Sequence, residues 1–422
     1  PALLGFAAAF LVIIGFAFIV PAVTTAAGRI AAPLVALLPR GTAWRLAARN
    51  LVRAMHRNSL TTAALMAAIA MTVGVSVMIY SFRASVDTWI NRTIQADLFV
   101  TLAANELTGF QTTIPDEVIG WLENHPLVES IDTFHEKRVP FRGEEAFLGV
   151  IRGRMRGELE FTGGDNDRKA QLLRSPGYVA VSESFARRHK VSEDDIIELA
   201  APAGPQTFRI AGVYTDYTRD QGVILMDRDN YITHWSAPGA HSSGVHLHDP
   251  SQADTLGNEL REKFGGDNEY AIYSNASLRE RIFEIFDQTF AVTYVLRTIS
   301  VIVAVLGVSL TLTTLVTERE REIGIMRAIG GSSGQVRRAF LAESALIGLL
   351  ASIVGLTAGA CLAMVLTWVI NLAFFGWTVQ LRYPWDLLAW TPVWIIATAA
   401  LAGLLPAIRA SRIEPATALR SE

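Results

Sequence analysis

The sequence of 422 residues is too rich in hydrophobic residues, at 51%, and too poor in charged ones, at 18%, for an ordinary soluble domain. Its formal net charge of −3 excludes the basic surface that nucleic-acid binding requires. The one cysteine, Cys361, excludes an intrachain disulfide and a thiolate metal site.

Five apolar stretches are long enough to cross a bilayer, which takes about 20 residues of helix. They lie at about 3–23, 59–80, 298–315, 340–360 with an extension to 375, and 390–408. Between the second and the third, residues 84–288 are mixed and polar, and they are numerous enough for a folded domain. Strand-like runs (97–102, 178–181, 207–214) alternate there with helix-like runs (115–123, 182–189, 252–264), which predicts a mixed α/β domain.

The arginines of the short loops set the orientation, because loops rich in Lys and Arg stay in the cytoplasm. One group precedes the second stretch and consists of Arg40, Arg45, Arg49, Arg53 and Arg57. Another lies between the third and fourth stretches and consists of Arg319, Arg321, Arg327, Arg337 and Arg338. Both loops are therefore expected inside, which places the α/β domain outside the cytoplasm and the C-terminus inside.

We predict a membrane α-helical protein with about five transmembrane helices and one large extracytoplasmic mixed α/β domain in a bacterial inner membrane. The predicted transmembrane helices are 1–28, 59–82, 290–316, 340–375 and 390–408. The other predicted segments are a cytoplasmic basic amphipathic segment (29–58), the extracytoplasmic domain (83–289), a cytoplasmic helix (317–339), an outer loop (376–389) and a cytoplasmic tail (409–422). The chain begins at Pro1 without a basic region or a clear cleavage site, so we expect a fragment and not a signal peptide.

Residues 317–339, TEREREIGIMRAIGGSSGQVRRA, form the most informative segment. Alternating charge opens a short helix with Ile325, Met326 and Ile329 on one face, and Gly330 with Gly331 can end it in a left-handed turn. A solvated connector with local ion pairs fits this pattern about as well as a docking element. Apolar residues beside charged ones favour docking, because an interface combines apolar anchors with a polar rim.

The same segment resembles the signature of the FtsX-like permease family, which includes lipoprotein-releasing and macrolide-efflux permeases. The matching residues are Glu322, Ile323, Gly324, Met326, Arg327, Ala328, Ile329 and Gly330, followed by Gln335, Arg337 and Glu343. The tail resembles the usual family ending through Glu414, Pro415, Ala416, Ala418, Leu419, Arg420 and Glu422. Residues 177–214 resemble the family's periplasmic core domain, so the resemblance covers roughly 48–422.

The resemblance implies a unit of one span, an outer domain and three spans, driven by a separate ABC ATPase dimer beneath the membrane. The additional first span suggests the C-terminal half of a tandem permease, with the missing half or a homodimer mate as the second unit. We expect no cofactor in this chain, and ATP and magnesium on the partner, because the chain has no GxxxxGK[ST] loop. The residues expected to couple to the ATPase are Glu318, Glu322, Ile323, Gly324, Ile325, Met326, Arg327, Ala328, Ile329 and Gly330.

Three further patterns are open to a structural and a functional interpretation. Gly348, Ser352, Gly355 and Gly359 predict a close helix contact, which is a packing feature more often than a sliding seam. Arg45, Arg49, Arg53 and Arg57 recur every four residues and suit anionic lipid headgroups, or less often a second ATPase contact. A metal site at His241, His246 and His248 is a weak alternative to incidental histidines, because no carboxylate is patterned as a further ligand.

Two classes of function follow, neither of them enzymatic. In the first, the partner's ATP cycle moves the spans, and the outer domain relays that motion to extract or export a lipid, lipoprotein or peptide. In the second, the same motion signals to an extracytoplasmic protein such as a cell-wall hydrolase, and nothing is transported.

Overall fold

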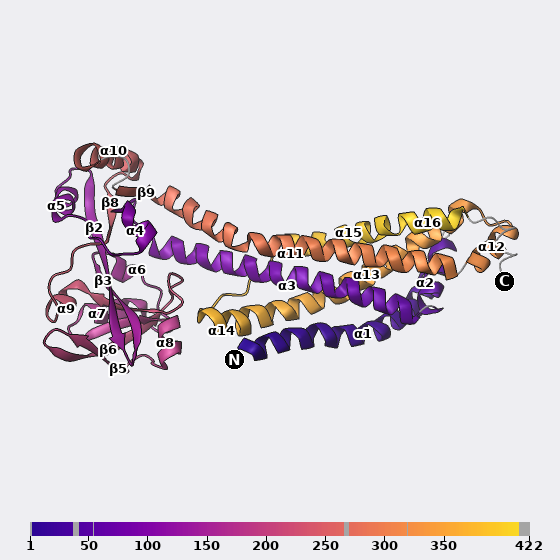
Figure 1. The fold of residues 1–422 in the computed structure, drawn as a ribbon, viewed down its shortest axis with the longest axis horizontal. Helices are drawn as coiled ribbons and strands as arrows, with labels where there is room; N and C mark the ends of the chain where they lie inside the picture. Colours follow the sequence, from indigo (N-terminus) through magenta and orange to yellow (C-terminus); the bar gives the residue numbers. More distant parts are fainter. Residues whose placement is uncertain (1, 37–41, 54, 266–269, 319, 413–422) are drawn as a thin grey trace. The chain divides into compact units, whose positions relative to one another are not determined.

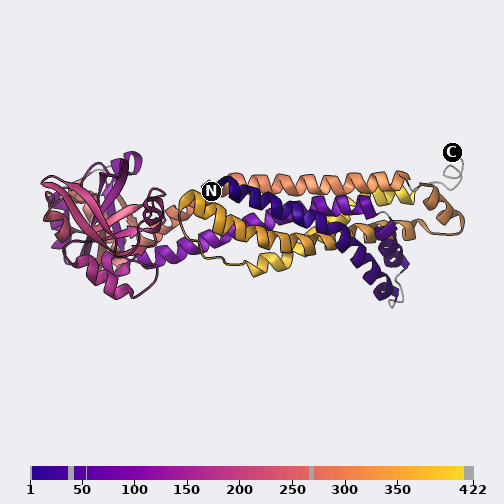
Figure 2. The same cartoon turned by 90° about the horizontal axis from the view of Figure 1, so that it is seen from below.

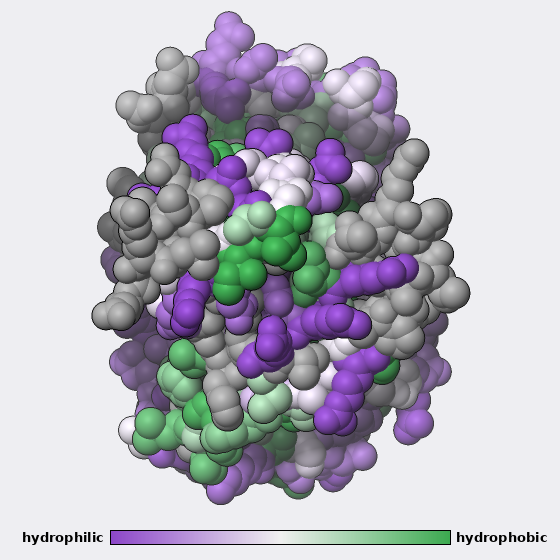
Figure 3. Space-filling model, turned by 90° about the vertical axis from the view of Figure 1, so that its right-hand side faces the viewer, coloured by the Kyte–Doolittle hydropathy of each residue, from purple (hydrophilic) through white to green (hydrophobic). Residues whose placement is uncertain are grey.

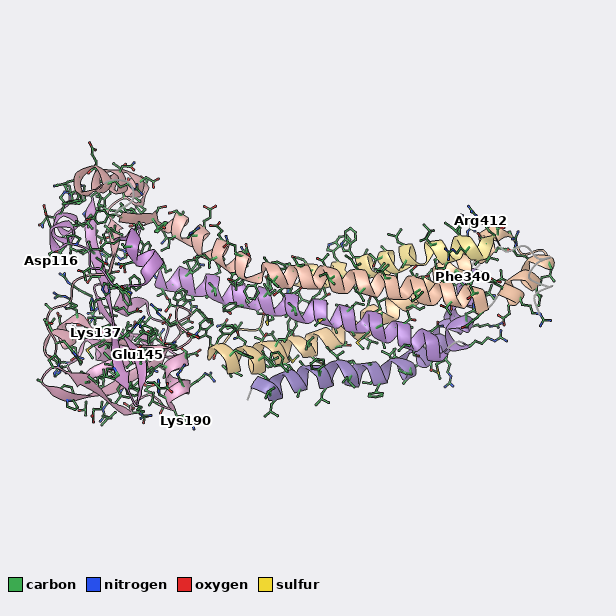
Figure 4. All side chains as sticks on the ribbon, in the orientation of Figure 1. Asp116, Lys137, Glu145, Lys190, Phe340 and Arg412 are labelled. Carbon is green, nitrogen blue, oxygen red and sulfur yellow. The ribbon has the colours of Figure 1, made fainter. Side chains whose placement is uncertain are left out.

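The computed structural model describes residues 2–36, 42–53, 55–265, 270–318 and 320–412. The chain packs into two compact units. The helical unit comprises residues 1–82, 290–370 and 380–422, and the sheet unit comprises residues 83–289 and 371–379. Each unit has its own apolar core, and the side chains of the sheet unit include the labelled Asp116 and Lys137 (Figure 4).

The helical unit is built from long apolar helices (Figure 1). Its elements are α1 (Ala2–Ala36), α2 (Thr42–Arg53), the first part of α3 (Met55–Thr93), the second part of α11 (Asn275–Glu318), α12 (Glu320–Ala328), α13 (Ser333–Val365), a π-helical turn (Leu366–Ile370), α15 (Trp385–Ala402) and α16 (Leu404–Ser411). Among the described residues, four segments are long and apolar enough to span a membrane: Leu3–Ile30, Asn58–Thr93, Ser333–Phe375 and Trp385–Ser411. The stretch 298–315 lies inside α11, and its role as a further span stays a prediction.

Helix α13 occupies the centre of the helical unit and packs against α1, α2, α15 and α16. Its buried residues include Phe340, Ile347 and Ala351, which share a core cluster with Ile69 and Val73 of α3. A helix that is apolar on most sides and buried on several is expected at the middle of a bundle, whereas its neighbours leave one side to lipid.

The sheet unit contains one nine-stranded sheet in the described residues, with the order β5-β6-β4-β7-β3-β2-β8-β1-β9. Its strands are drawn as arrows in Figure 2. The strands are β1 (Leu98–Leu102), β2 (Val128–Phe141), β3 (Glu144–Arg152), β4 (Tyr178–Ser182), β5 (Ile196–Ala201), β6 (Gly204–Tyr214), β7 (Val223–Asp227), β8 (Ser242–Leu247) and β9 (Tyr270–Ser274). The helices are α4 (Ala103–Thr108), α5 (Asp116–Glu123), α6 (Met155–Glu158), α7 (Asn166–Arg174), α8 (Glu183–His189), α9 (Arg228–Ile232), α10 (Ala253–Phe264) and α14 (Asn371–Phe375). The pairs β3/β7 and β4/β6 are parallel and the others antiparallel, so the predicted mixed α/β domain is confirmed.

Two glycines of the sheet unit adopt positive φ values where a tight turn or a close backbone contact requires them. Strands β2 and β3 are joined by Arg142 and Gly143, which both have positive φ values (49° and 84°), as a two-residue hairpin turn of type I′ requires. Gly222 also has a φ of 84°, and a Cβ placed there would lie 2.3 Å from the backbone nitrogen of Phe185. The start of β7 can therefore approach the first turn of α8 only at a glycine.

Candidate functional site

Helix α12 presents one apolar face outward and anchors the opposite face. Ile323 is 4% exposed and belongs to the core cluster of the helical unit, whereas Ile325 is 45% and Ile329 82% exposed. Arg327 donates a hydrogen bond from Nη1 to the backbone carbonyl of Ser411, at 3.2 Å. The helix therefore has a fixed inner side, tied to the end of α16, and leaves two isoleucines without a described partner surface.

The residues around these isoleucines are polar or turn-forming. Glu318, Glu322 and Ala328 are exposed and Gly324 is buried, while the side chain of Met326 lies outside the described set. Gly330 has a φ of 101°, so the left-handed turn predicted after the helix is confirmed. Ser332 and Gln335 then form a capping box that starts α13.

The α12 side of the helical unit combines apolar and hydrophilic surface. Helices α2 and α12 both carry exposed apolar side chains, among them Trp44 and Leu46 of α2. Figure 3 views this side and shows hydrophobic residues gathered in patches among hydrophilic ones. Phe340 of α13 and Arg412, which follows α16, are labelled at the same end of this unit in Figure 4. An apolar patch with a polar rim is the composition of a protein-docking surface.

Helix α2 turns its arginines away from the bundle. Ala47 and Ala48 are fully buried on its inner side, whereas Arg45, Arg49 and Arg53 are exposed. The side chain of Arg57 lies outside the described residues. On the inner side, Asn50 donates a hydrogen bond to Glu343 Oε2 of α13 at 3.4 Å, and Glu343 is 1% exposed. The buried carboxylate thus contacts a neighbouring helix, while Arg45, Arg49 and Arg53 lie on the outer side of α2.

The small residues of α13 lie where other helices approach most closely. A Cβ on Gly348 would lie 2.9 Å from the Ala399 side chain of α15. On Gly355 and Gly359 it would lie 2.8 Å and 2.7 Å from Ile69 and Val73 of α3. Ser352 is fully buried and bonds back to the carbonyl of Gly348 at 2.7 Å. These four positions therefore set the spacing of α13 from α3 and α15.

Residues 371–379, predicted partly as the end of a transmembrane helix (340–375) and partly as an outer loop (376–389), pack into the sheet unit. These residues follow the π-helical turn after α13, and Thr378 makes three hydrogen bonds to the sheet unit. Its amide donates to Glu183 Oε2 at 2.9 Å, and its carbonyl accepts from the Tyr217 hydroxyl at 2.9 Å. Arg187 donates a hydrogen bond to the Thr378 hydroxyl oxygen at 3.0 Å. Two residues of α8, Glu183 and Arg187, therefore bind Thr378.

Aromatic contacts reinforce this segment. Trp377 is 9% exposed and meets Tyr217 edge to face at 5.6 Å, and Tyr217 meets Trp89 in the same way at 5.9 Å. Gly376 has a φ of 72° and passes the Ser184 backbone, where a Cβ would lie at 3.1 Å. Burial raises the pKa of Tyr217, with Glu183 adding to the effect, so its hydroxyl keeps the proton that it donates. The cluster of aromatic residues at 374–377 was the only sequence signal for this contact.

His241 and His246 make side-chain contacts within the sheet unit. His246 is buried and pairs with Asp132 at 2.9 Å. His241 stacks on His135 with ring centroids 4.3 Å apart, and its Nδ1 accepts a hydrogen bond from the Glu136 amide at 3.0 Å. Burial, and then the neighbouring His135, lower the pKa of His241 to about 4. No cluster of three or more possible metal ligands occurs among the described residues, so the structure gives the metal hypothesis no support.

Comparison with known proteins matches both units to established families. Residues 59–263 match the model of the MacB-like periplasmic core domain, and residues 294–415 match that of the FtsX-like permease C-terminal region. The chain belongs to the FtsX-like permeases. The predicted family is confirmed, and so are the fold class and the location: a multi-pass protein of the cell membrane with its α/β domain outside the cytoplasm.

Relatives of this permease are themselves described as permeases. An uncharacterized ABC transporter permease protein of Mycobacterium tuberculosis is 32% identical over 427 residues, which cover 99% of this chain and 49% of that protein. The macrolide export ATP-binding/permease protein MacB of Hyphomonas neptunium is 30% identical over 157 residues, covering 37% of this chain and 23% of that protein. The chain thus spans about half the length of the mycobacterial relative.

Among solved structures, the periplasmic region of MacB from Actinobacillus actinomycetemcomitans aligns with 44% of this chain and 91% of its own, at 14% identity and a TM-score of 0.32.

Proposed function

We propose that this permease couples ATP hydrolysis by a separate ABC ATPase dimer to the extraction or export of a hydrophobic substrate, such as a lipid, lipoprotein or peptide. The observation that carries the proposal is the segment 371–379, which joins α13 to α15 and is hydrogen-bonded into the sheet unit through Thr378. Any movement of the ends of these two helices would pull directly on α8 and Tyr217. The sheet unit then acts as the working part of a mechanical relay.

The input side of the relay in this proposal is α12. Ile325 and Ile329 would be its apolar anchors in the ATPase, and the exposed Glu322 would lie at the edge of the contact. The bond from Arg327 to the end of α16 favours a lever that moves with the bundle, since a loosely attached helix would absorb the push. ATP and magnesium would be held by the ATPase, and a second permease unit, as the other half of a longer chain or a second copy, would complete the membrane part.

A second function is favoured by a polar cavity of about 420 Å³ in the sheet unit. It is lined by charged residues of both signs, including Glu123, Arg152 and Arg228, and by Ser130, whose buried hydroxyl has no hydrogen-bond partner among the described residues. Such a lining suits a polar protein partner better than a lipid. In this alternative, the relay switches an extracytoplasmic partner such as a cell-wall hydrolase, and no substrate crosses or leaves the membrane.

The input side is tested with Ile325→Asp combined with Ile329→Asp. Placing two carboxylates on the docking face should abolish stimulation of the ATPase by the permease in proteoliposomes, because each buried charge would lack a partner. Ile196→Asp, at a β5 position that is 59% exposed, is the matched control and should leave stimulation unchanged. Full stimulation in the α12 double variant would refute the docking assignment.

The output side is tested with Tyr217→Phe and Thr378→Val, which remove one hydroxyl each and keep the fold. Each change deletes a hydrogen bond worth about 1 kcal/mol. We expect ATPase stimulation to persist while ATP-dependent release of a labelled lipid falls. If a hydrolase is activated without any release of lipid in the unmodified protein, the signalling alternative replaces the transport proposal.

A further inference from the structure

A groove in the helical unit lies between three helices and has a volume of about 610 Å³. Its walls come from α3 (Leu65, Ile69), α11 (Val305) and α15 (Trp390, Trp394) of this unit, which are labelled in Figure 1. We propose that this groove binds an acyl chain of a membrane lipid whose headgroup carries an ammonium group, with Asp386 as the headgroup contact. Binding of such a lipid goes beyond the proposed function, because it needs neither the ATPase nor transport.

The lining favours a hydrocarbon occupant. Trp390 and Trp394 are 63% and 68% exposed, so their indole rings offer large apolar faces to whatever fills the groove. The threonines of α15 add little polarity, because Thr391 and Thr398 bond back to carbonyls of their own helix at 2.7 Å and 2.9 Å. The volume falls within the range of roughly 300–1,000 Å³ that small-molecule sites occupy. Within a bilayer, lipid chains are the apolar material at hand, so an acyl chain suits these walls.

A helix from another protein suits the groove less well. Helices in membranes approach each other over small residues, which let the backbones come close. The close-packed glycines of α13 are already used between helices of the same chain, Gly348 against α15 and Gly355 and Gly359 against α3. Most residues that line the groove are tryptophans and branched aliphatic residues, with Ala68 and three threonines among them. A flexible chain can follow such walls, whereas a helix backbone cannot come close to them.

The headgroup contact follows from the position of Asp386. This residue lies in the first turn of α15, lines the groove, and comes seven positions after Val379, the last residue of the extracytoplasmic sheet unit. Asp386 is exposed, and within the described part of the chain no ion pair to it is found. A carboxylate at the membrane surface beside an apolar slot attracts an ammonium headgroup and repels a purely anionic one. The structure therefore favours phosphatidylethanolamine over phosphatidylglycerol.

The test uses the full chain in nanodiscs that contain a phosphatidylethanolamine or a phosphatidylglycerol with the same photoactivatable acyl chain. Cross-linked peptides are mapped and counted by mass spectrometry. We expect cross-links in α3 and α15 around the groove, with the ethanolamine lipid ahead by about two- to five-fold, the range expected of an exposed charge pair. Asp386→Asn should remove this preference and keep the cross-links.

Groove-filling variants separate the site from general contact with the bilayer. Ala68→Phe places a ring in the groove and should lower the cross-links there at least five-fold, while Ala389→Phe, on the same helix as the tryptophans but outside the lining, should leave them unchanged. Thr398→Phe fills the groove from α15 and replaces Ala68→Phe if that variant does not yield a monodisperse protein. Equal cross-linking in the filled and control variants would overturn the site. Equal labelling by the two lipids in the unmodified chain would overturn the headgroup assignment. If the peptides that line the groove carry no lipid cross-link in the complex with the ATPase, a partner helix fills the groove instead.

Discussion

Acidification should destabilise the sheet unit through His241, because the folded protein binds this imidazole in its neutral form. It is 4% exposed, it stacks on His135, and its Nδ1 accepts the Glu136 amide proton. Protonation would place a hydrogen on Nδ1 against that N–H donor and a charge beside a second imidazole. The fold therefore resists protonation, and burial with the neighbouring His135 lowers the pKa of His241 to about 4.

The sign and size follow from linkage between protonation and folding. The unfolded chain binds a proton at this imidazole below pH 6.5, its ordinary pKa, whereas the folded chain does so only near pH 4. The stabilisation is therefore complete above pH 6.5 and is lost as the pH falls toward the folded value. Each pH unit in that window costs at most about 1.4 kcal/mol, so the free energy of unfolding should fall by about 2 kcal/mol between pH 6.5 and 4.5 from this residue alone.

The measurement is urea unfolding of the full chain in detergent, followed by tryptophan fluorescence at a series of pH values. His241→Asn keeps an acceptor near the position of Nδ1 and does not titrate, so it should lose about 2 kcal/mol less than the unmodified chain over the same window. His248→Asn, at an exposed position after β8, is the control and should follow the unmodified chain. Identical pH slopes for the unmodified chain and His241→Asn would refute the reasoning.

Two further predictions concern local geometry. Gly222 and Gly143 both have a φ of 84°, but only at Gly222 would the Cβ of an alanine meet the α8 backbone. Gly143→Ala should therefore lower the free energy of unfolding by about 1–2 kcal/mol, and Gly222→Ala by markedly more. Similar urea midpoints for the two variants would contradict the steric argument. In the Arg83–Asp287 pair, at 2.6 Å, both side chains are about half exposed, so a double-mutant cycle with alanine should give a coupling of only about 0.2–1 kcal/mol, weaker at high salt. Arg83→Ala should cost more than Asp287→Ala, because Arg83 also lies 4.8 Å from the ring of Phe283, and equal costs would exclude that ring contact as a stabilising one.

Local patterns in the sequence predicted several elements that depend on neighbouring residues. The runs 178–181 and 207–214 became β4 and the larger part of β6, and the apolar stripe of 252–264 became α10, because alternation and helical periodicity are properties of a single element. The β2–β3 hairpin was missed, although a two-residue turn with glycine separates two strand-like runs there. Its charged residues, such as Glu136 and Arg138, hide the alternation.

Features that join distant residues could not be predicted. Thr378 contacts Glu183 and Tyr217 across more than 150 positions of the sequence, and neither partner carries a local sign of that contact. The groove beside Trp390 likewise exists only because α15 lies next to α3 and α11. The glycines of α13 indicated a close helix contact, but the identity of the helix that approaches each glycine is a property of the packed bundle.

Helices α3 and α11 each run without a break through the boundary between the two units, at residues 82/83 and 289/290. Adding one residue to a helix turns everything beyond it by about 100° and moves it by about 1.5 Å. Homologous chains should therefore differ in the length of these helices by insertions or deletions of about seven residues, which restore the rotation to within about 20°. A single-residue insertion near either boundary would be far less tolerated than the same insertion in a surface turn of the sheet.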